Sequence, residues 1–390
     1  MVPNGWNSKP LVQLLDKIID YRGQSVPKAT SGIPLITARN VRDGYLDFSN
    51  QEYIEESKFN EWMTRGTPQK GDILFTTEAP LGKACRYPKT GVYGVGQRTV
   101  TLRTNNKLDS EFLLYTILSE RGQLLIDLRS SGSTAKGIKS SELKKVKITY
   151  PESLPEQRKI AQILSTWDKA IATTEKLIDA SKQQKKALMQ QLLTGKKRLV
   201  DPETGKAYEG DWEEVKLGEI SYITTGNSNR EDSSLDAEYT FFDRSEDIRK
   251  SSRYLFDSEA VIVAGEGQDF IPKYFKGKFD LHQRTYAIMN FEKSVGKFLY
   301  YYIGFTRHYF LSQAVGSTVK SLRLPMFQKM PIQLPSKDEQ QKIASVLTAA
   351  DKEIELLEAK LAHFKQEKKA LMQQLLTGKR RVKVAETEAA

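Results

Sequence analysis

The chain has 390 residues, enough for two or three domains, and its 39% hydrophobic and 28% charged residues are typical of a soluble protein. No apolar run approaches the about 20 residues of a membrane-spanning helix, the N-terminus lacks a secretory pattern, and the one cysteine, Cys85, excludes an intramolecular disulfide. The net charge of +11 favours a polyanionic partner, and we expect a cytoplasmic protein with no metal, because its three histidines are scattered.

The first 151 residues form the first expected globular block. Short strand-like runs are bounded by Gly and Pro, and a helical pattern lies between the third run and the fourth. The strands are expected at residues 32–37, 71–76, 99–103 and 146–150, and the helix at 110–129. This order of elements favours a mixed α+β domain.

Residues 152–198 are expected to form a long helix. Apolar residues recur at alternating four- and three-residue steps, which is the a/d seam of a coiled coil. The seam consists of Ile160, Leu164, Trp167, Ile171, Ile178, Leu188 and Leu192. Thr174, Ser181 and Lys185 interrupt it, and polar seam residues are suited to fixing the register of the pair. Gly195 follows the last leucine as a candidate C-cap.

A second block (199–335), a second helix (336–381) and a short tail (382–390) repeat this order. Strands are expected at 259–265 and 285–290, and a helix at 295–315. The second seam consists of Ile343, Leu347, Ala350, Ile354, Leu357, Leu361, Phe364, Leu371 and Leu375. Lys368 interrupts this seam, and Gly378 follows it. Residues 199–338 hold 21 acidic and 18 basic residues, so any anion bound by this block must be held by a local patch.

The two long helices are the clearest internal repeat. KKALMQQLLTGK occurs at 185–196 and again at 368–379, and residues 156–198 and 339–381 share 25 identities in 43 positions. If the helices pair in one closed seam, the second must run back along the first. We therefore expect an antiparallel pair with the blocks at opposite ends, related by a pseudo-twofold axis.

Polar residues retained on the helices indicate that each helix end binds the same kind of partner. They are Lys185, Lys186, Gln190 and Gln191 in the first copy and Lys368, Lys369, Gln373 and Gln374 in the second. The alternative is an internal structural hairpin without a binding role.

The two blocks resemble each other more weakly. Gln97-Arg98 matches Gln283-Arg284, and the run from Gly132 to Lys136 matches the run from Gly316 to Lys320. No pattern in the chain predicts catalysis: GVYGVG at 91–96 lacks the features of a dinucleotide-binding turn, and TGK at 204–206 is only a fragment of a phosphate loop. We therefore expect a chain that recognises rather than reacts, with no cofactor of its own.

In combination, these features resemble the specificity (S) subunits of Type I restriction-modification systems over essentially the whole chain. The resemblance rests on the LLTGK-ended helices, the start at Pro3 to Trp6 that recurs at Glu209 to Trp212, the GDILF run, the Gln-Arg pairs and the G-S-T loops. The second block departs from the pattern, because GDILFTTEAPLGK becomes EAVIVAGEGQDFIPK and the start lacks the proline.

The resemblance implies two target-recognition domains, each reading one half of a split sequence in double-stranded DNA, joined by helices that set the spacing. It also implies that two methyltransferase (M) subunits dock on the helices and carry the S-adenosylmethionine chemistry. Restriction (R) subunits, which use ATP and Mg, join this complex in bacterial defence. The chain itself is then not an enzyme.

Candidate DNA contacts are cations and amides at matched positions, since Arg, Lys, Asn and Gln reach base edges and phosphates. They are Arg39, Asn40, Lys83, Gln97, Arg98, Lys136 and Lys139 in the first block and Arg244, Gln283, Arg284, Lys320 and Arg323 in the second. A structural ion pair is the alternative for Arg98 and Arg284, and a solvated loop for Arg39, Asn40 and Arg244.

Two other classes of function remain open. A coiled-coil scaffold with protein-binding heads has no DNA role, and salt-dependent DNA binding by the assembled complex separates it from the first hypothesis. A stand-alone methyltransferase-nuclease requires cofactor binding by the isolated chain.

Overall fold

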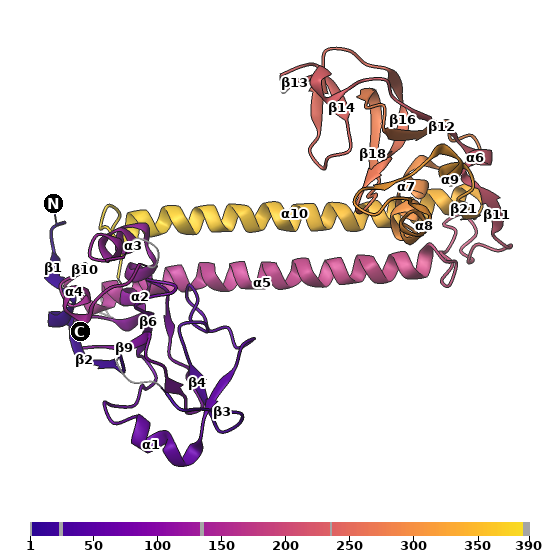
Figure 1. The fold of residues 1–390 in the computed structure, drawn as a ribbon. Helices are drawn as coiled ribbons and strands as arrows, with labels where there is room; N and C mark the ends of the chain where they lie inside the picture. Colours follow the sequence, from indigo (N-terminus) through magenta and orange to yellow (C-terminus); the bar gives the residue numbers. More distant parts are fainter. Residues whose placement is uncertain (1, 23–25, 133–135, 235, 385–390) are drawn as a thin grey trace. The chain divides into compact units, whose positions relative to one another are not determined.

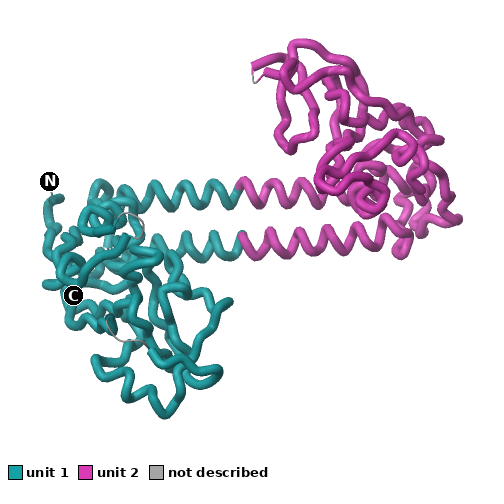
Figure 2. The backbone as a smooth tube through the Cα atoms, viewed as in Figure 1, with its two compact units in different colours: residues 1–174, 360–390 teal, residues 175–359 magenta. Residues whose placement is uncertain are grey.

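The computed structural model describes residues 2–22, 26–132, 136–234 and 236–384. The chain divides into two compact units, residues 1–174 with 360–390 (unit 1) and residues 175–359 (unit 2), which Figure 2 colours separately. Each unit combines one globular block with part of both long helices, α5 (Leu154–Leu192) and α10 (Lys337–Leu375). No helix in the described ranges is long and apolar enough to cross a membrane.

Three small sheets lie in the described part of the block of unit 1. Strands β1 and β10 pair antiparallel, a second sheet has the order β2-β9-β6-β7, and a third has the order β3-β5-β4-β8. The strands are β1 (Trp6–Pro10), β2 (Leu15–Asp20), β3 (Lys28–Ala29), β4 (Ile33–Ile36), β5 (Glu52–Ile54), β6 (Ile73–Thr76), β7 (Ala84–Arg86), β8 (Gly94–Val95), β9 (Thr99–Thr104) and β10 (Lys147–Pro151). The four expected strands of this block are confirmed as β4, β6, β9 and β10.

The single helix expected at 110–129 is wrong in one respect, because the chain turns sharply in its middle. Helix α2 (Ser110–Leu118) ends at Ser119, whose hydroxyl then accepts from Gly122 N at the start of α3 (Glu120–Asp127). A Cβ at Gly122 would lie 1.9 Å from the Thr116 carbonyl oxygen, so only glycine fits this corner. The described part of the block also has the short helices α1 (Phe59–Trp62) and α4 (Ser140–Leu143) and the 3-10 helices η1 (Leu11–Leu14) and η2 (Glu56–Lys58).

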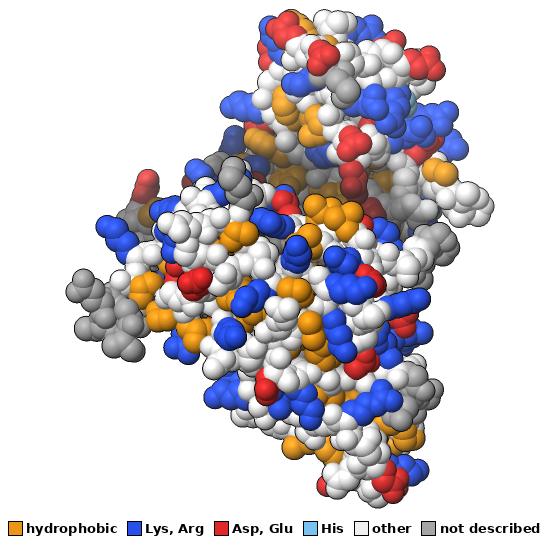
Figure 3. All heavy atoms as spheres, turned by 90° about the vertical axis from the view of Figure 1, so that its left-hand side faces the viewer, with side chains coloured by type: hydrophobic (Ala, Val, Ile, Leu, Met, Phe, Trp, Pro, Cys, Tyr) orange, Lys and Arg blue, Asp and Glu red, His pale blue; other side chains and the backbone are white. Residues whose placement is uncertain are grey.

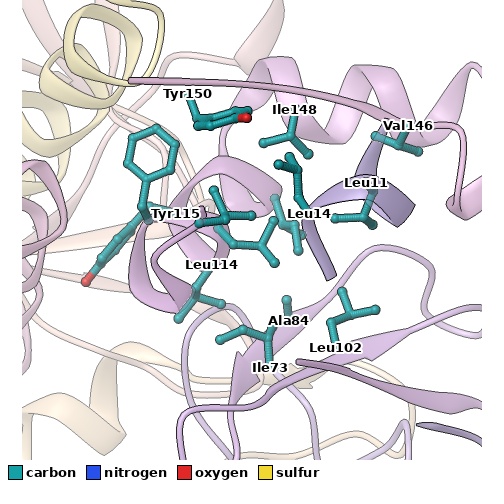
Figure 4. Close-up of a cluster of buried hydrophobic side chains, with 14 of the residues drawn as sticks. Leu11, Leu14, Ile73, Ala84, Leu102, Leu114, Tyr115, Val146, Ile148 and Tyr150 are labelled. Atoms are coloured by element: carbon teal, nitrogen blue, oxygen red, sulfur yellow. The ribbon is translucent and has the colours of Figure 1, made fainter. Parts of the chain in front are cut away.

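The main core of unit 1 lies between strand β10, helix α2 and the β2-β9-β6-β7 sheet. Figure 4 shows side chains of β10, among them Ile148 and Tyr150, above Leu11 and Leu14, with Ile73 of β6 on the far side. The same core includes residues from both long helices, namely Ile160, Ala161 and Leu164 of α5 and, at the end of α10, Leu375 and Leu376. The block and the helix ends therefore share one hydrophobic core.

The block of unit 2 is built around one larger sheet of seven strands, in the order β12-β19-β16-β18-β14-β15-β13. Two further pairs, β11-β21 and β17-β20, lie outside it. The strands are β11 (Glu213–Lys216), β12 (Tyr222–Thr225), β13 (Ser233–Ser234), β14 (Tyr239–Phe242), β15 (Arg249–Ser251), β16 (Phe256–Ala264), β17 (Glu266–Gly267), β18 (Lys273–Leu281), β19 (Thr285–Met289), β20 (Lys320–Ser321) and β21 (Pro331–Leu334). The two expected strands are confirmed as β16 and β19.

The helix expected at 295–315 is also two helices. α7 (Gly296–Phe305) ends at Thr306, where backbone φ and ψ leave the helical region, and α8 (His308–Gln313) follows. The described part of this block also has the short helices α6 (Leu217–Ile220) and α9 (Leu324–Gln328), which contact each other. The order of elements in unit 2 thus repeats that of unit 1, with a mixed helix and sheet content that confirms the expected fold class.

The two long helices lie side by side and run antiparallel (Figure 1). In unit 1, Trp167 of α5 packs edge-on against Phe364 of α10, with ring centroids 5.5 Å apart. In unit 2, Lys182 of α5 pairs with Glu358 of α10 at 2.7 Å. The expected antiparallel coiled-coil-like pair is confirmed within each unit.

The ends of the helices pack against the starts of the blocks, which explains why both motifs occur twice. Gly195 and Gly378 have φ of +67° and +70°, as expected for helix C-caps. Ideal Cβ atoms on them would lie 3.5 Å from the Trp212 ring and 3.1 Å from the Trp6 ring. The LLTGK ends and the tryptophan starts are therefore two sides of one contact, made once in each unit.

Candidate DNA-binding surfaces and helix surfaces

Three segments of unit 1 meet at the end of strand β6. Thr77 N donates to Arg98 O over 3.0 Å, which joins the end of β6 to the Gln-Arg segment before β9. Ile138 N donates to Thr77 O over 2.9 Å, which joins the same point to the segment that carries Lys136 and Lys139. The structure therefore brings four of the predicted contact residues, dispersed over some forty positions in the sequence, around one junction.

Unit 2 builds the same junction at the end of strand β16. Gly265 N donates to Arg284 O over 2.9 Å, and Leu322 N donates to Gly265 O over 2.7 Å. By these bonds Arg284 of unit 2 corresponds to Arg98 of unit 1. Leu322 corresponds to Ile138 in the same way, so the residues next to them also correspond. The matched pairs are Gln97 with Gln283, Arg98 with Arg284, Lys136 with Lys320, and Lys139 with Arg323. Ser133 and Thr134 of the G-S-T loop lie outside the described residues.

A hollow of about 380 Å³ opens beside this junction in unit 1. Arg39, Gln97 and Arg98 line it, together with Lys28, whose ammonium group lies 2.8 Å from Glu52. Arg39 and Arg98 are exposed, so their guanidinium groups are accessible from solvent. A cavity and three of the predicted DNA contacts therefore coincide in this part of unit 1.

Arg39 and Arg244 do not occupy the same position, although both follow a matched strand. Ile36 O of β4 accepts from Gly96 N, and Phe242 O of β14 accepts from His282 N, so these carbonyls are equivalent. Arg39 then lies three residues after its strand and Arg244 two residues after its own.

Asn40 lies in the interior rather than on a surface. Its Oδ1 accepts from Thr37 N and Thr37 Oγ1, each at 2.9 Å, and its Nδ2 donates to Asp47 O and Asn50 O. The side chain is fully buried, and these four bonds use its hydrogen-bonding capacity. Asn40 therefore holds the loop that carries Arg39 and has no group free for DNA.

The remaining candidates are four lysines and one arginine near the surface. Lys136 is exposed, whereas Lys83 and Lys320 are half-buried, and Lys320 lies in strand β20. Lys83 pairs with Asp43 at 2.7 Å, and Lys136 pairs with Asp127. Lys139 and Arg323 are exposed at the residues that precede α4 and α9. Surface pairs of this kind contribute about 0–1 kcal/mol, so breaking them costs little free energy.

Two hydrogen bonds that involve side chains hold the Gln-Arg segment of unit 2. Gln283 Nε2 donates to Asn229 Oδ1 at 2.7 Å, and His282 Nδ1 accepts from Arg284 N at 3.0 Å. Burial, helped by the nearby Arg244, lowers the pKa of His282 below its ordinary value. The neutral ring that results is the form that accepts this hydrogen bond.

Sequence reasoning missed one acidic residue in each unit. Glu78 follows β6 and lies 3.1 Å from Arg98, whereas Glu266 holds Arg244 at 2.5 Å and Arg284 at 2.6 Å. Burial opposes ionisation of Glu266, but hydrogen bonds from the two arginines outweigh it and lower the pKa of the carboxyl. The sequence signal that would have identified them is a glutamate two residues after the matched strand in each block, in Thr77-Glu78 and in Gly265-Glu266.

Lys185 and Lys368 lie between the helices and the blocks. In unit 1, Lys368 pairs with Asp168, which accepts from the Tyr115 hydroxyl at 2.6 Å. In unit 2, Lys185 pairs with Asp351, which accepts from the Tyr301 hydroxyl at 2.6 Å. The retention of the two lysines therefore has an intramolecular explanation, and it does not by itself indicate a partner.

The other predicted partner-binding residues lie on the outer surface of the helices. Lys186, Gln190 and Gln191 are exposed on α5, and Lys369, Gln373 and Gln374 are exposed on α10. In unit 1, Glu120 of α3 engages Lys369 at 2.7 Å and Gln373 at 2.8 Å. The residue of unit 2 that corresponds to Glu120 is Thr306, which has no carboxylate. The two helix ends therefore differ in their contacts with the neighbouring block.

An apolar hollow of about 480 Å³ lies beside the outer surface of α10 in unit 1. Its lining combines apolar residues, among them Leu125, Met372 and Leu376, with Lys369 and Lys379. It opens between the α2–α3 corner, strand β10 and the last turns of α10.

On the face of the molecule drawn in Figure 3, Lys and Arg side chains are scattered widely, with hydrophobic side chains between them.

No cluster of His, Cys, Asp and Glu suited to a metal ion occurs among the described residues. Cys85 is buried, and burial raises the pKa of its thiol to about 12, so the thiol stays protonated near neutral pH.

The comparisons with known proteins agree on one family. Residues 24–182 and 209–366 each match the family model described as "Type I restriction modification DNA specificity domain". A putative type I restriction enzyme MjaX specificity subunit of Methanocaldococcus jannaschii is 27% identical, over 98% of this chain and 95% of that protein. The EcoDI specificity subunit of Escherichia coli is 32% identical over 43% of this chain and 37% of its own length.

Solved structures share the fold. The S subunit of a Type I restriction-modification system from M. genitalium has a TM-score of 0.63 at 16% identity, over 96% of this chain and 97% of that chain. A chain from a structural study of complex assembly and conformational transition of the type I R-M system has a TM-score of 0.59, over 97% of this chain and 100% of that chain. The two family matches cover the two blocks in turn, so the chain belongs to the Type I restriction-modification specificity family and has two target-recognition domains.

Proposed function

We propose that each target-recognition domain binds one half of a bipartite site in double-stranded DNA through the junction described above. The observation that carries this proposal is the duplication of the junction. Both units assemble a Gln-Arg segment and a cationic loop around the end of one strand, although their blocks differ in sequence and in sheet size. Two domains that read different half-sites require the same scaffold at the junction and different residues around it.

The two kinds of cation have different tasks. Arg98 and Arg284, each beside a glutamine, are suited to base edges in the major groove, because guanidinium and amide groups match the donor and acceptor patterns of bases. Arg39 and Arg244 lie near them and support this role. The other predicted cations contact phosphates and fix the register of the duplex. They are Lys83, Lys136, Lys139, Lys320 and Arg323.

DNA binding by the complex of this chain with its M subunits tests the proposal. Affinity for a duplex that carries the methylated site should fall steeply with salt. Removing the Lys320 side chain should reduce the slope of log affinity against log salt concentration by about one, and it should weaken binding to all sequences alike. Removing Arg284 should instead weaken discrimination at one half-site. A complex that assembles but shows no salt-dependent DNA binding favours the scaffold hypothesis.

We further propose that two M subunits dock on the helix pair, one near each end. The exposed Lys186 and Gln190 on α5, Lys369 on α10 and the adjacent apolar hollow support this assignment. R subunits then join, and catalysis belongs to the partners, with S-adenosylmethionine on M and ATP and Mg on R.

The mass of the purified complex measures the number of M subunits. We expect two per chain, and reversing the charge at Lys186 or Lys369 should remove one while the double variant should remove both. A stable one-to-one complex at saturating M subunit would contradict the docking proposal.

The helices are also proposed to set the spacer between the half-sites. Matched heptads inserted after Lys176 and after Ala359 keep the two helices in register and add about 10 Å, or about three base pairs. The added twist of about 100° weakens binding, but surviving methylation should prefer a longer spacer with both half-sites unchanged. Full-strength methylation at the original spacer would show that the helices are not the ruler.

A further inference from the structure

The carboxylates Glu78 and Glu266 occupy equivalent places beside the two Gln-Arg segments. Each comes directly after the residue whose amide bonds the arginine carbonyl, Thr77 in unit 1 and Gly265 in unit 2. The sequences around them differ, with TTEAP in one unit and AGEGQ in the other. A carboxylate is therefore retained beside the matched cations and amides of both junctions.

The geometry ties each carboxylate to an arginine. Glu78 Oε1 lies 3.1 Å from Arg98 Nε, and Glu266 bonds Nη1 of Arg284 through Oε1 and Nη1 of Arg244 through Oε2. The Glu266 side chain is only 16% exposed, whereas those of Arg244 and Arg284 are 49% and 58% exposed. Glu266 is thus a fixed inner anchor with two arginine groups outside it.

These contacts leave the base-reading edges of the arginines free. Arg98 uses Nε, so both terminal nitrogens remain for a two-bond contact with guanine O6 and N7. Arg284 uses Nη1, so its Nε and Nη2 remain for the same kind of contact. A guanidinium group that is already oriented loses less side-chain freedom when it meets a base.

We propose that Glu78 and Glu266 are positioning residues that aim the base-reading arginines, and that they contribute to sequence specificity without contacting DNA themselves. The inference rests on the proposed DNA-reading function of the two domains. A carboxylate at this surface repels phosphates, so it opposes binding to any sequence and favours only a site that engages the aimed arginine. Its removal should therefore lower specificity and leave non-specific affinity equal or higher.

The test uses the complex with M subunits, and the methylated site is first determined by sequencing modified bases in a host that expresses both. Methylation rates are then measured on duplexes with the cognate site and with single base-pair changes in either half. A complete two-bond contact gives about 5- to 150-fold discrimination. We expect Glu266→Gln to reduce this discrimination about tenfold, only at the half-site of unit 2. Glu78→Gln should reduce discrimination less, at the other half-site.

Asp257→Asn is the matched control, because Asp257 is an exposed acid on β16, the strand that leads to Glu266, and the change removes the same charge. It should leave discrimination unchanged. Glu266→Asp should restore part of the discrimination, since a carboxylate is present again. Binding to a duplex without the site should not weaken in Glu266→Gln.

Three outcomes overturn the inference. If discrimination is unchanged in both Glu266→Gln and Glu266→Ala, the carboxylate does not position the arginine. A switch of preferred base pair shows that it reads a base directly, and equal losses at both half-sites with a lower melting temperature show a purely structural role. A wild-type complex without half-site discrimination would instead refute the proposed function itself.

Discussion

The Tyr–Asp–Lys arrangement between block and helices makes the sharpest prediction about how unit 1 is held together. Asp168 on α5 accepts from the Tyr115 hydroxyl at 2.6 Å and pairs with Lys368 on α10. The Lys368 ammonium group also lies 5.5 Å from the centre of the Tyr115 ring. Asp168→Ala removes the group that joins the block to both helices, and it leaves a lysine whose side chain is only 21% exposed without its carboxylate.

The expected cost follows from these contacts. A hydrogen bond to a charged acceptor contributes about 1.5–3 kcal/mol, and the ion pair adds about 0–1 kcal/mol because Asp168 is partly solvated. We expect Asp168→Ala to lower the free energy of unfolding of unit 1 by about 2–3 kcal/mol, or its melting temperature by about 4–12 °C. Asp168→Asn should cost less, since an amide oxygen still accepts from the tyrosine.

Hydrogen–deuterium exchange measured on peptides of the full chain localises the effect. Asp168→Ala should speed exchange in residues 110–127 and 360–376 and leave unit 2 unchanged, whereas Asp351→Ala should affect unit 2 alone. Asp179→Ala is the control, because Asp179 is an exposed acid on the same helix. Equal protection in wild type and Asp168→Ala would refute the reasoning, as would a loss spread over both units.

Further predictions concern the same structural repeats. Burial and the neighbouring Asp168 raise the pKa of Tyr115 above its ordinary value of 10.0, so folding favours the protonated hydroxyl. This contribution is complete below pH 10 and falls as pH rises towards the folded-state pKa, so Tyr115→Phe should lose less stability than wild type in a titration above pH 10. Gly378→Ala should destabilise the chain more than Gly195→Ala in denaturant unfolding, because both glycines have positive φ but only the Cβ at Gly378 would meet Pro3 Cγ at 2.6 Å. Gln340→Leu should cost about 1–3 kcal/mol by leaving Val295 N, which donates to Gln340 Oε1 at 2.8 Å, without its acceptor, and calorimetry should show no such loss for the exposed Gln341→Leu.

The long helices and their repetition were predictable because their signals are local. A seam with steps of three and four residues, and two glycines after the last leucines, depend on neighbouring residues alone. The break at Ser119 was not predictable from periodicity, because apolar residues continue on both sides of it. The larger sheet of unit 2 was missed in part because β13 and β15 are short and polar. The short apolar strand β14 pairs with β18, which is distant in the sequence.

The candidate sites were predictable only in part. Matching the two blocks paired Arg98 with Arg284 and Lys136 with Lys320, and the backbone hydrogen bonds at the junctions give the same pairs. Burial was beyond the sequence pattern, so Asn40 was expected on a surface and lies in the interior. Lys185 and Lys368 were expected both as seam interruptions and as partner contacts, and their aspartate partners favour the first interpretation.

The central claim is that two target-recognition domains read two half-sites independently, and a domain exchange tests it most directly. Residues 1–150 are replaced by the corresponding block of a related specificity subunit, and the modified bases are sequenced in a host that expresses the hybrid with its M subunit. The account predicts a site in which one half is new, while the half read by unit 2 and the length of the spacer are unchanged. A hybrid that modifies DNA at a site with both halves altered, or at the original site, would contradict it.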